Sequence, residues 1–428
     1  MNKTMAILVA VLVVAAGAVA AFTLIPGDDD KVSIPEVAEG TGTVYGNADG
    51  NCFIDKVDVA IAESIINGER TLEEFPFADA DCSGTVDSKD VQLIKDMINK
   101  KDMKVKVLDT QDKIISVQYP IKNPIILSGS NLAPLMNILD FSDIVVGAAY
   151  NTLDPVRDYS IYNGIESGKI TKIGVNGTAA DLDIVSELIL KKDADVMLCE
   201  YSGMYDLDSD VNITQFNEWG LDVLCMECRD PGDDMRSLAV FGILLDRGKN
   251  VQDYMKFCDE VYKDIKKVEG DKFGTTTVLV SSLKGSLSGT GSGYYPMSIT
   301  AGGKNLADWS GSTKSVKVGD VWIFEDKYAS DVLLLGASSN YGLAEFTDSD
   351  IAAYEERYTN HNAWKNDRAF IFSTSTPVVV RIAYMAEFMY PDLFEDGWAN
   401  GIHQDFVDKY FDTDYTVEES RFIKKLSS

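Results

Sequence analysis

PIILSGSNLAPLMNILDFSDIVVGAA, residues 124–149, holds an apolar run, a helical stretch and a second apolar run in direct succession. Short, nearly all-apolar runs are typical of parallel strands that are buried on both faces. Similar runs recur at 115–119, 170–174, 195–200 and 221–226. Because helical segments such as 179–192 lie between them, the pattern predicts an α/β domain over residues 105–235.

A second α/β block follows a helical stretch over residues 234–268, in which apolar residues recur at three- and four-residue spacing. In that block we predict strands at 275–282, 332–338 and 369–374 and a helix at 378–391. The chain has 428 residues, 45% of them hydrophobic, so it is long enough for several cores. Two lobes joined by one long helix predict a ligand cleft between the lobes, with only modest closure.

Four segments, in this order along the chain, resemble one family of transport proteins. They are residues 124–149, GTAADLDIVSELILKKDADVML (177–198), ITAGGKNLADW (299–309) and FIFSTSTPVVVRIAYMAEFMYPDLF (370–394). Residues 105–425 thus look like the substrate-binding proteins of ABC importers for ferric siderophores, haem and cobalamin. The resemblance implies two Rossmann-like lobes that capture a metal chelate and deliver it to an ABC permease and its ATPase.

The same resemblance implies where the permease would dock. One acidic residue per lobe pairs with an arginine of the permease in that family, and in the first lobe this position falls on Glu187. In the second lobe the usual spacing is not kept, so Asp320 and Glu325 are both candidates. A solvated helix carboxylate is the alternative interpretation of Glu187. Such surface carboxylates contribute to steering and register more than to affinity.

Ligand-facing residues are expected in the loops after the strands, where open α/β sheets bind ligands. Aromatic residues there could stack on a chelate or macrocycle, and an arginine could face an anionic group. The candidates are Tyr150, Asn151, Tyr201, Tyr205, Tyr294, Tyr295, Trp309 and Arg381, with Arg157 as a further arginine. Ordinary packing is the alternative for each of them. Tyr294 and Tyr295 could also form a phenolate pair for bare ferric iron.

Two twelve-residue acidic stretches, NADGNCFIDKVD (47–58) and DADCSGTVDSKD (79–90), match position by position. Positions 1, 3, 5 and 12 carry oxygen side chains and position 7 offers a backbone carbonyl, which together suit Ca²⁺. The predicted calcium ligands are Asn47, Asp49, Asn51, Phe53 and Asp58 in the first loop and Asp79, Asp81, Ser83, Thr85 and Asp90 in the second. A short apolar helix follows each loop.

Residues 43–100 therefore resemble a dockerin module, an all-α calcium-binding unit without the entering helix of an EF-hand. The resemblance implies Ca²⁺ at both loops and a possible cohesin partner. Position 6 is Cys52 in the first loop but Gly84 in the second. Glycine adopts positive φ readily and cysteine does not, so we expect the second loop to bind Ca²⁺ more tightly. We also expect the module to be an acidic stalk that unfolds alone when Ca²⁺ is removed.

The amino terminus carries an apolar run over residues 5–25 after Lys3. The run is long enough to span a membrane, and an uncleaved anchor is preferred over a signal cleaved near residues 18–21. Both alternatives place the rest of the chain outside the cytoplasm. The predicted parts are a signal or anchor helix (1–27), a linker (28–42), the calcium module (43–102), lobe one (103–235), the connecting helix (236–269) and lobe two (270–428).

Composition excludes several functions. The net charge of −29 argues against nucleic acid or an anionic membrane surface as a partner. With two histidines the chain lacks the usual ligands of a receptor for bare transition metals. The Gly-rich stretch SGTGSGYYP (288–296) is neither a phosphate loop nor a dinucleotide turn, and no GxSxG elbow is present. We therefore expect a binding protein without a redox cofactor, and not an enzyme.

The cysteines and the second functional hypothesis stay open from sequence alone. Six cysteines are too few for a disulfide framework in a chain of this length. Cys52 and Cys82 could bridge the two loops. Cys225 and Cys228 form a C-M-E-C pair, for which ordinary strand-end cysteines are preferred over a redox or metal site because no second CxxC pair accompanies them. The alternative function is surface attachment or adhesion, in which the dockerin-like module binds a cohesin and the lobes are its cargo.

Overall fold

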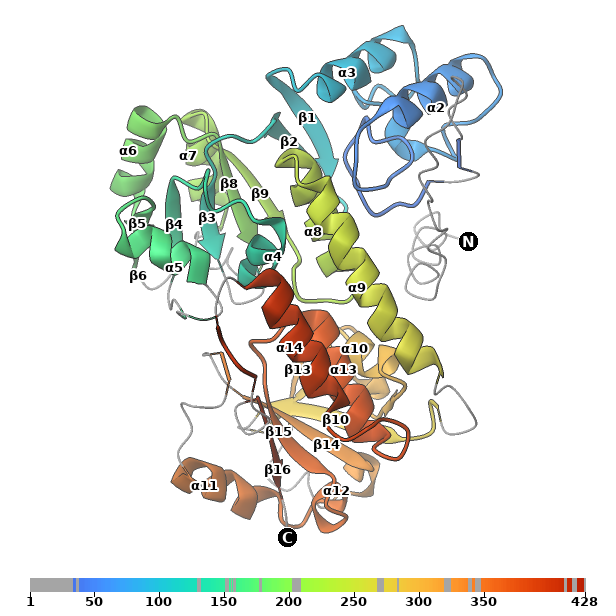
Figure 1. Cartoon of the computed structure of the whole chain (residues 1–428), viewed down its shortest axis with the longest axis vertical. Helices are drawn as coiled ribbons and strands as arrows, with labels where there is room; N and C mark the ends of the chain where they lie inside the picture. The colour runs from blue at the N-terminus through green and yellow to red at the C-terminus, as the bar shows by residue number, and fades with distance from the viewer. Residues whose placement is uncertain are drawn as a thin grey trace. The chain divides into compact units, whose positions relative to one another are not determined.

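The computed structural model describes residues 34–35, 38–128, 132–150, 154, 156, 159–176, 179–201, 209–267, 273–282, 285–318, 325–337, 341–342, 348–411, 414–417 and 422–426. The chain forms two compact units (Figure 1). Unit 1 comprises Met1–Asn151, Gly168–Cys228 and Gly232–Asp253. Unit 2 comprises Thr152–Ser167, Arg229–Pro231 and Tyr254–Ser428.

Unit 1 is built on a five-stranded, all-parallel sheet in the order β5-β4-β3-β8-β9. Its strands are β3 Ile125–Ser128, β4 Gly147–Tyr150, β5 Thr171–Ile173, β8 Val196–Glu200 and β9 Asp222–Met226, and a short antiparallel pair, β6 Val175–Asn176 and β7 Ala179–Ala180, lies apart from it. Every residue of β8 and β9 is buried, which explains their nearly all-apolar sequences. The helices of this sheet are α4 Leu132–Leu139, α6 Leu182–Lys192 and α7 Ser209–Glu218.

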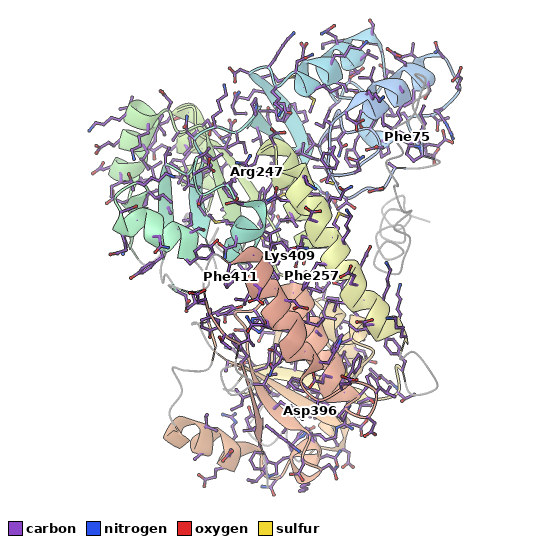
Figure 2. The ribbon with its side chains drawn as sticks, viewed as in Figure 1. Phe75, Arg247, Phe257, Asp396, Lys409 and Phe411 are labelled. Atoms are coloured by element: carbon purple, nitrogen blue, oxygen red, sulfur yellow. A yellow bond between two sulfur atoms is a disulfide. The ribbon has the colours of Figure 1, made fainter. Side chains whose placement is uncertain are left out.

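The calcium-loop region also belongs to unit 1. It contains α2 Lys56–Ile66, the 3₁₀ turn η1 Pro76–Ala78, α3 Ser88–Ile98 and the antiparallel hairpin of β1 Met103–Leu108 and β2 Ile114–Tyr119. Phe75, labelled in Figure 2, is fully buried in its small core with Ile61 and Ala78. Residues 115–119, predicted as a strand of the lobe, thus lie in this hairpin and not in the parallel sheet.

Many contacts join this region to the rest of unit 1. Arg236 donates hydrogen bonds to Thr43 Oγ1 at 3.1 Å and to the carbonyl oxygens of Leu108 and Asp109 at 3.0 and 2.6 Å. Lys104 forms an ion pair with Asp222 of β9. The calcium region and the parallel sheet therefore share one compact unit, which contradicts the expectation of a separate acidic stalk.

The helical stretch predicted over residues 234–268 is two helices, α8 Asp233–Leu244 and α9 Gly248–Lys267. Leu245–Arg247 separate them, with Asp246 at φ +59° and the Arg247 amide donating to Gly242 O at 2.6 Å. Along the chain, α9 begins in unit 1 and ends in unit 2. Only α9 therefore corresponds to the predicted connecting helix.

Unit 2 contains a seven-stranded mixed sheet in the order β13-β11-β10-β14-β15-β16, with β12 paired to β10. Its strands are β10 Thr277–Ser282, β11 Ser286–Ser288, β12 Lys304–Asn305, β13 Ser315–Lys317, β14 Val332–Ala337, β15 Ala369–Ser373 and β16 Ile423–Leu426. Its helices are α5 Tyr159–Glu166, α10 Tyr294–Thr300, α11 Asp348–Tyr358, α12 Asn362–Lys365, α13 Val378–Met389 and α14 Trp398–Tyr410, with 3₁₀ turns η3 Asp308–Ser310 and η5 Asp326–Tyr328. The parallel strands β10, β14 and β15 form its centre.

Aromatic packing fixes the second half of α9 within unit 2. The ring of Tyr254 meets that of Phe406 on α14 edge-on at a centroid distance of 6.3 Å. Lys409 Nζ lies 5.8 Å from the centroid of the Phe257 ring, and both residues are labelled in Figure 2. Such contacts bury the apolar face that the sequence spacing predicted for this helix.

One disulfide joins Cys199 of β8 to Cys225 of β9, which are directly paired in the sheet register. Cys52 and Cys82 are free, so the bridge considered between the two loops is not formed. The predicted membrane segment, residues 5–25, lies outside the described residues. Among the helices that the structure does describe, none is long and apolar enough to cross a membrane.

Candidate functional site

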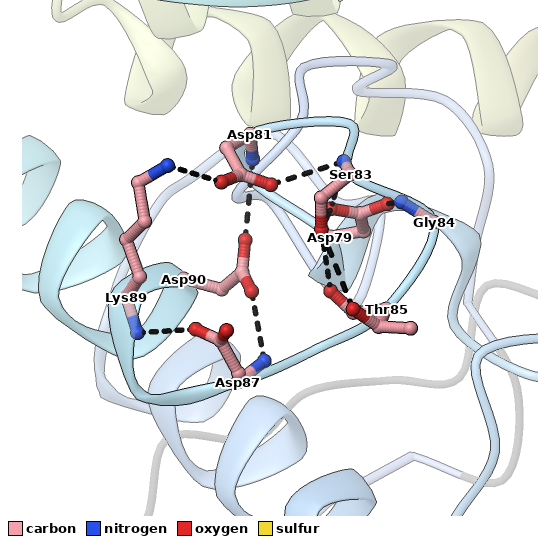
Figure 3. A network of polar contacts seen from close by, with 8 residues as sticks. All are labelled: Asp79, Asp81, Ser83, Gly84, Thr85, Asp87, Lys89 and Asp90. Atoms are coloured by element: carbon pink, nitrogen blue, oxygen red, sulfur yellow. Dashed lines mark hydrogen bonds and ion pairs between the residues drawn. The ribbon is translucent and has the colours of Figure 1, made fainter.

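The second acidic loop brings three carboxylates together (Figure 3). Carboxylate oxygens of Asp79, Asp81 and Asp90 all lie within 4.8 Å of one another. Ser83 Oγ donates to the carbonyl oxygen of Thr85 at 3.0 Å, so the predicted ligands at positions 5 and 7 are also adjacent. Hard oxygen donors at this density suit Ca²⁺, which takes six to eight of them.

The first loop repeats the backbone hydrogen bonds of the second. Asp58 accepts from the amides of Asp49 at 3.2 Å and Asp55 at 2.7 Å. In the second loop, Asp90 accepts from the amides of Asp81 at 3.2 Å and Asp87 at 2.8 Å. In both loops the position-9 and position-12 aspartates form a capping box at the start of the following helix. The two loops therefore share the same backbone hydrogen bonds as well as the same sequence pattern, and the same capping box joins each loop to its following helix.

The loops differ at positions 4 to 6. In the second loop Cys82 and Gly84 have φ of +60° and +92°, and the Gly84 amide donates to Asp79 Oδ2 at 2.7 Å. In the first loop Gly50 has φ +71°, while Cys52 does not have a positive φ. The first loop thus accommodates cysteine at position 6 by a different backbone path.

Burial sets the electrostatics of the first loop. Asp49 and Asp58 are 4% and 0% exposed, and no lysine or arginine within the described part of the chain forms an ion pair with either. Desolvation raises the pKa of Asp49 to about 7, and desolvation followed by the charge of Asp49 raises the pKa of Asp58 well above its usual value. Two buried carboxylates without a counter-charge are a site that a bound cation would stabilise.

Asn47, at position 1 of the same loop, carries an unsatisfied acceptor. Its Nδ2 donates to the carbonyl oxygens of Gly42 and Asn51 at 2.6 and 2.7 Å. Its Oδ1 is buried and has no hydrogen-bond partner among the residues that the structure describes. A buried amide oxygen without a partner is rare, and in this position it fits a cation ligand.

The second loop is more exposed and carries a basic neighbour. Lys89 Nζ lies 2.6 Å from Asp81 Oδ2, and this hydrogen bond lowers the pKa of Asp81. Burial raises the pKa of Asp90. The residues of both loops therefore fit Ca²⁺, by carboxylate clustering in the second loop and by unpaired buried oxygens in the first.

Of the ligand-facing candidates in unit 1, only Tyr201 has a described side chain. Its hydroxyl donates to Asp109 Oδ2 at 2.5 Å, and burial together with this bond raises the pKa of Tyr201. Asp109 also accepts from the amides of Gln111 and Lys113 in the β1–β2 turn. Asn151 and Tyr205 lie outside the described residues, as does the side chain of Tyr150.

In unit 2 the structure brings Tyr294 and Arg381 together. The guanidinium of Arg381 lies 5.9 Å from the centroid of the Tyr294 ring, and its Nε donates to Thr376 O at 2.6 Å. Tyr295 is half-buried at the start of α10. Trp309 is 48% exposed, and its ring packs against that of Tyr328 in an edge-to-face arrangement. Arg157 lies outside the described residues.

Both described docking candidates are at the surface. Glu187 on α6 forms an ion pair with Lys191, one helical turn further on. Glu325 lies 3.1 Å from Lys327. Their exposure is what docking requires, but it is equally what a solvated carboxylate shows, so the role stays a prediction. Asp320 lies outside the described residues.

Sequence reasoning missed Asp109, Arg236 and the Cys199–Cys225 disulfide. The predicted strands 195–200 and 221–226 place both cysteines near a strand end, which was the available signal. The neighbour relation of β8 and β9 is a tertiary fact that this pattern does not contain. The bonds of Asp109 to Tyr201 and of Arg236 to Thr43 join residues that are far apart in sequence, so no local motif marks these contacts.

Two α/β units built on parallel strands, with one long helix running from the first into the second along the chain, define the TroA-like periplasmic-binding fold. Solved structures with this fold match the chain. The TroA-like periplasmic binding protein FepB of Veillonella parvula matches with a TM-score of 0.56 and 14% identity, covering 75% of this chain and 99% of that one.

Two further structures match similarly. MolA of Haemophilus influenzae, solved with molybdate, has a TM-score of 0.54 and 14% identity, covering 73% of this chain and 99% of its own. CeuE of Helicobacter pylori, solved as a nickel–histidine complex, has a TM-score of 0.52 and 14% identity, covering 73% and 97%. At this identity the likeness shows the fold, and it confirms the predicted α/β architecture.

No protein-family model matches the sequence, and no curated protein sequence matches it. FepB and MolA are periplasmic binding proteins by name, whereas the expectation that this chain is not an enzyme stays a prediction. The dockerin-like module stays a prediction, because none of these comparisons tests it.

Proposed function

We propose that this protein is an extracytoplasmic solute receptor that captures a metal chelate and delivers it to an ABC import permease with its ATPase. The fold carries the proposal, because matched structures of this fold include FepB, a nickel complex of CeuE and molybdate-bound MolA. A ferric siderophore, haem or a cobalamin-like molecule is the proposed ligand class. The apolar segment at residues 5–25 is the proposed membrane anchor.

The side chains of unit 2 support an aromatic or anionic chelate. Tyr294 offers a ring face, and the buried cation of Arg381 lies over that ring. Trp309 presents an exposed indole. Rings with a nearby guanidinium bind flat, negatively charged ligands by stacking and charge attraction.

Calcium at both loops is part of the proposal. In the first loop Asn47, Asp49, Asn51 and Asp58 would supply side-chain oxygens and Phe53 a carbonyl. Bound Ca²⁺ supplies positive charge that compensates the buried carboxylates. Because the loops lie within unit 1, Ca²⁺ binding would stabilise unit 1 as a whole and not a detached module.

Ligand capture is tested by purifying the protein from its native source and identifying co-purifying small molecules by mass spectrometry. The apoprotein is then titrated with ferric siderophores, haem and cobalamin while tryptophan fluorescence is followed. We expect one class to bind and to quench the Trp309 contribution, which Trp309→Phe removes. No response from any member of the panel, in fluorescence or calorimetry, would contradict a chelate receptor.

Surface attachment through a cohesin is the second candidate. The observation that favours it is the matched capping geometry of the two loop–helix halves, a symmetric arrangement with exposed polar positions on α3 such as Gln92 and Lys95. Calcium-dependent binding to a cohesin panel, measured by calorimetry, would support attachment. Chelate binding without cohesin binding would leave transport as the function.

A further inference from the structure

The first calcium loop is enclosed, whereas the second is open. Residues 38–42 cover the first loop, with the Glu39 amide donating to Asp49 O and the Gly42 amide to Gly50 O, both at 2.7 Å. A Cβ atom at Gly42 would collide with Asn51 O and approach Ile243 Cδ1 of α8 to 2.8 Å. A Cβ atom at Gly84 of the second loop would meet nothing within 4 Å.

The far side of the first loop lies against the start of α9. A Cβ atom at Gly248, the first residue of α9, would collide with the carbonyl oxygen of Cys52 and lie 2.8 Å from the ring of Phe53. Only glycine permits this approach. Cys52 and Phe53 occupy positions 6 and 7 of the loop, and the carbonyl oxygen of Phe53 is the proposed calcium ligand at position 7. The helix start and the calcium loop are therefore in direct contact.

We define the α8–α9 junction as residues 245–251. It is a tight turn: Asp246 has φ +59°, and the amides of Asn250 and Val251 donate to Arg247 O at 3.0 and 3.2 Å. A Cβ atom at Gly242 of α8 would collide with Val251 Cγ2. Along the chain, the junction precedes the point within α9 where unit 1 ends and unit 2 begins.

We propose that the first calcium loop is a regulatory site, at which Ca²⁺ orders the α8–α9 junction, while the second loop acts locally. The proposal rests on calcium binding as proposed above. Its physical basis is the contact of Cys52–Phe53 with Gly248. Ca²⁺ bound in the loop would hold this segment through the Phe53 carbonyl. Asn47 Oδ1 is buried and lacks a hydrogen-bond partner within the described part of the chain, and this is the independent sign of a cation in this loop.

Removing Ca²⁺ from the first loop leaves Asp49 and Asp58 buried without a counter-charge. The loop then relaxes to rehydrate them, and its contact with Gly248 loosens. Since α9 carries the chain from unit 1 into unit 2, the ordering of its first turn would make solute affinity depend on Ca²⁺. By linkage, solute binding would raise the affinity of the first loop for Ca²⁺ by the same factor.

The test compares amide hydrogen exchange of the full chain in excess Ca²⁺ and in chelator, with calorimetry reporting Ca²⁺ binding to the same samples. The matched variants are Asp58→Asn and Asp90→Asn, which alter position 12 of the first and second loops. We expect Ca²⁺ to slow exchange at residues 247–251 about tenfold in the wild type and in Asp90→Asn, but not in Asp58→Asn. Exchange in β14 of unit 2 is the internal standard for folding.

Calcium binding without slower exchange at the junction would overturn this proposal and leave the calcium sites intact. If Ca²⁺ failed to slow exchange at residues 247–251 in both variants, the proposal would also be overturned, because the first loop would then have no separate role. An absence of Ca²⁺ binding in calorimetry would instead overturn the calcium sites themselves. Gly248→Ala gives a second test: we expect Ca²⁺ binding to persist while the exchange response at 249–251 falls at least threefold.

Discussion

At the scale of single residues, Cys82 holds an unfavourable backbone conformation. Its φ is +60°, and a side chain in the left-handed region raises the energy by roughly 1–2 kcal/mol relative to glycine. We predict that Cys82→Gly stabilises unit 1 by about 1 kcal/mol, measured by urea unfolding in the presence of chelator.

Cys52 is the matched control for Cys82. It occupies position 6 of the first loop, does not have a positive φ and is 7% exposed. Cys52→Gly removes a buried side chain without relieving strain, so it should destabilise unit 1. Equal effects of the two substitutions would show that backbone strain at Cys82 does not limit stability.

His403 gives unit 2 a defined response to pH. Its Nδ1 lies 3.0 Å from the Tyr384 hydroxyl and its Nε2 lies 2.5 Å from that of Tyr341, in a fully buried site. Burial lowers its pKa to about 3 from the ordinary 6.5. Between pH 6.5 and 3 the unfolded chain binds one more proton than the folded chain. The contribution of the neutral His403 to the free energy of unfolding is therefore complete above pH 6.5 and is lost as pH falls toward 3.

We predict that His403→Gln flattens the dependence of unfolding free energy on pH between 6.5 and 3. The slope should fall by up to ~1.4 kcal/mol per pH unit, the value for one proton. Urea unfolding of unit 2 at several pH values measures it. Tyr341→Phe removes a hydrogen bond but keeps the imidazole, so its slope should match the wild type; an unchanged slope in His403→Gln would contradict the assignment.

At the scale of elements, the disulfide holds two neighbouring strands, β8 and β9. It closes a loop with a sequence separation of 26 residues, and a bridge of this length contributes about 3 kcal/mol by restricting the unfolded chain. We predict that Cys199→Ala with Cys225→Ala lowers the stability of unit 1 by this amount. Urea unfolding with and without reductant checks it.

The double variant should lose its response to reductant. Cys228→Ser is the control, because Cys228 is buried and free near the end of β9 and should leave the response to reductant intact. A reductant-insensitive wild type would contradict a stabilising disulfide.

Helices and strands were predictable from sequence where the local pattern of apolar residues determines the type of element. The buried parallel strands β3, β8, β9, β10, β14 and β15 were all predicted, because their apolar runs are long enough to be distinct. The hairpin strand β2 has the same β-branched composition as a lobe strand, and only its antiparallel pairing with β1 separates the two. The break between α8 and α9 was missed although residues 246–250 contain no apolar side chain and so interrupt the apolar spacing.

At the scale of the whole molecule, the clustering of oxygen side chains in the two acidic loops was predictable, whereas the contacts of the ligand-facing candidates were not. The ten predicted calcium ligands fall within two short loops, so spacing alone predicts their proximity. Contacts such as Tyr201 with Asp109 or Tyr294 with Arg381 join segments that are distant in sequence. The first contact joins the β1–β2 turn to the end of β8 in another sheet, and the second joins the helices α10 and α13. One sequence does not specify such packing between elements.

The proposed transport role requires docking to a permease, and a substitution at Glu187 tests that requirement. Its side chain is 58% exposed on α6, so Glu187→Ala should leave chelate affinity unchanged. A surface ion pair is worth about 1 kcal/mol, which predicts an uptake rate about fivefold lower in vesicles carrying the permease and ATPase. Raised salt should reduce the difference in uptake rate between the wild type and Glu187→Ala, because salt screens exposed charges. Glu218→Ala, an exposed carboxylate on α7, is the control; equal uptake by both variants, or weaker chelate binding by Glu187→Ala, would exclude the docking role.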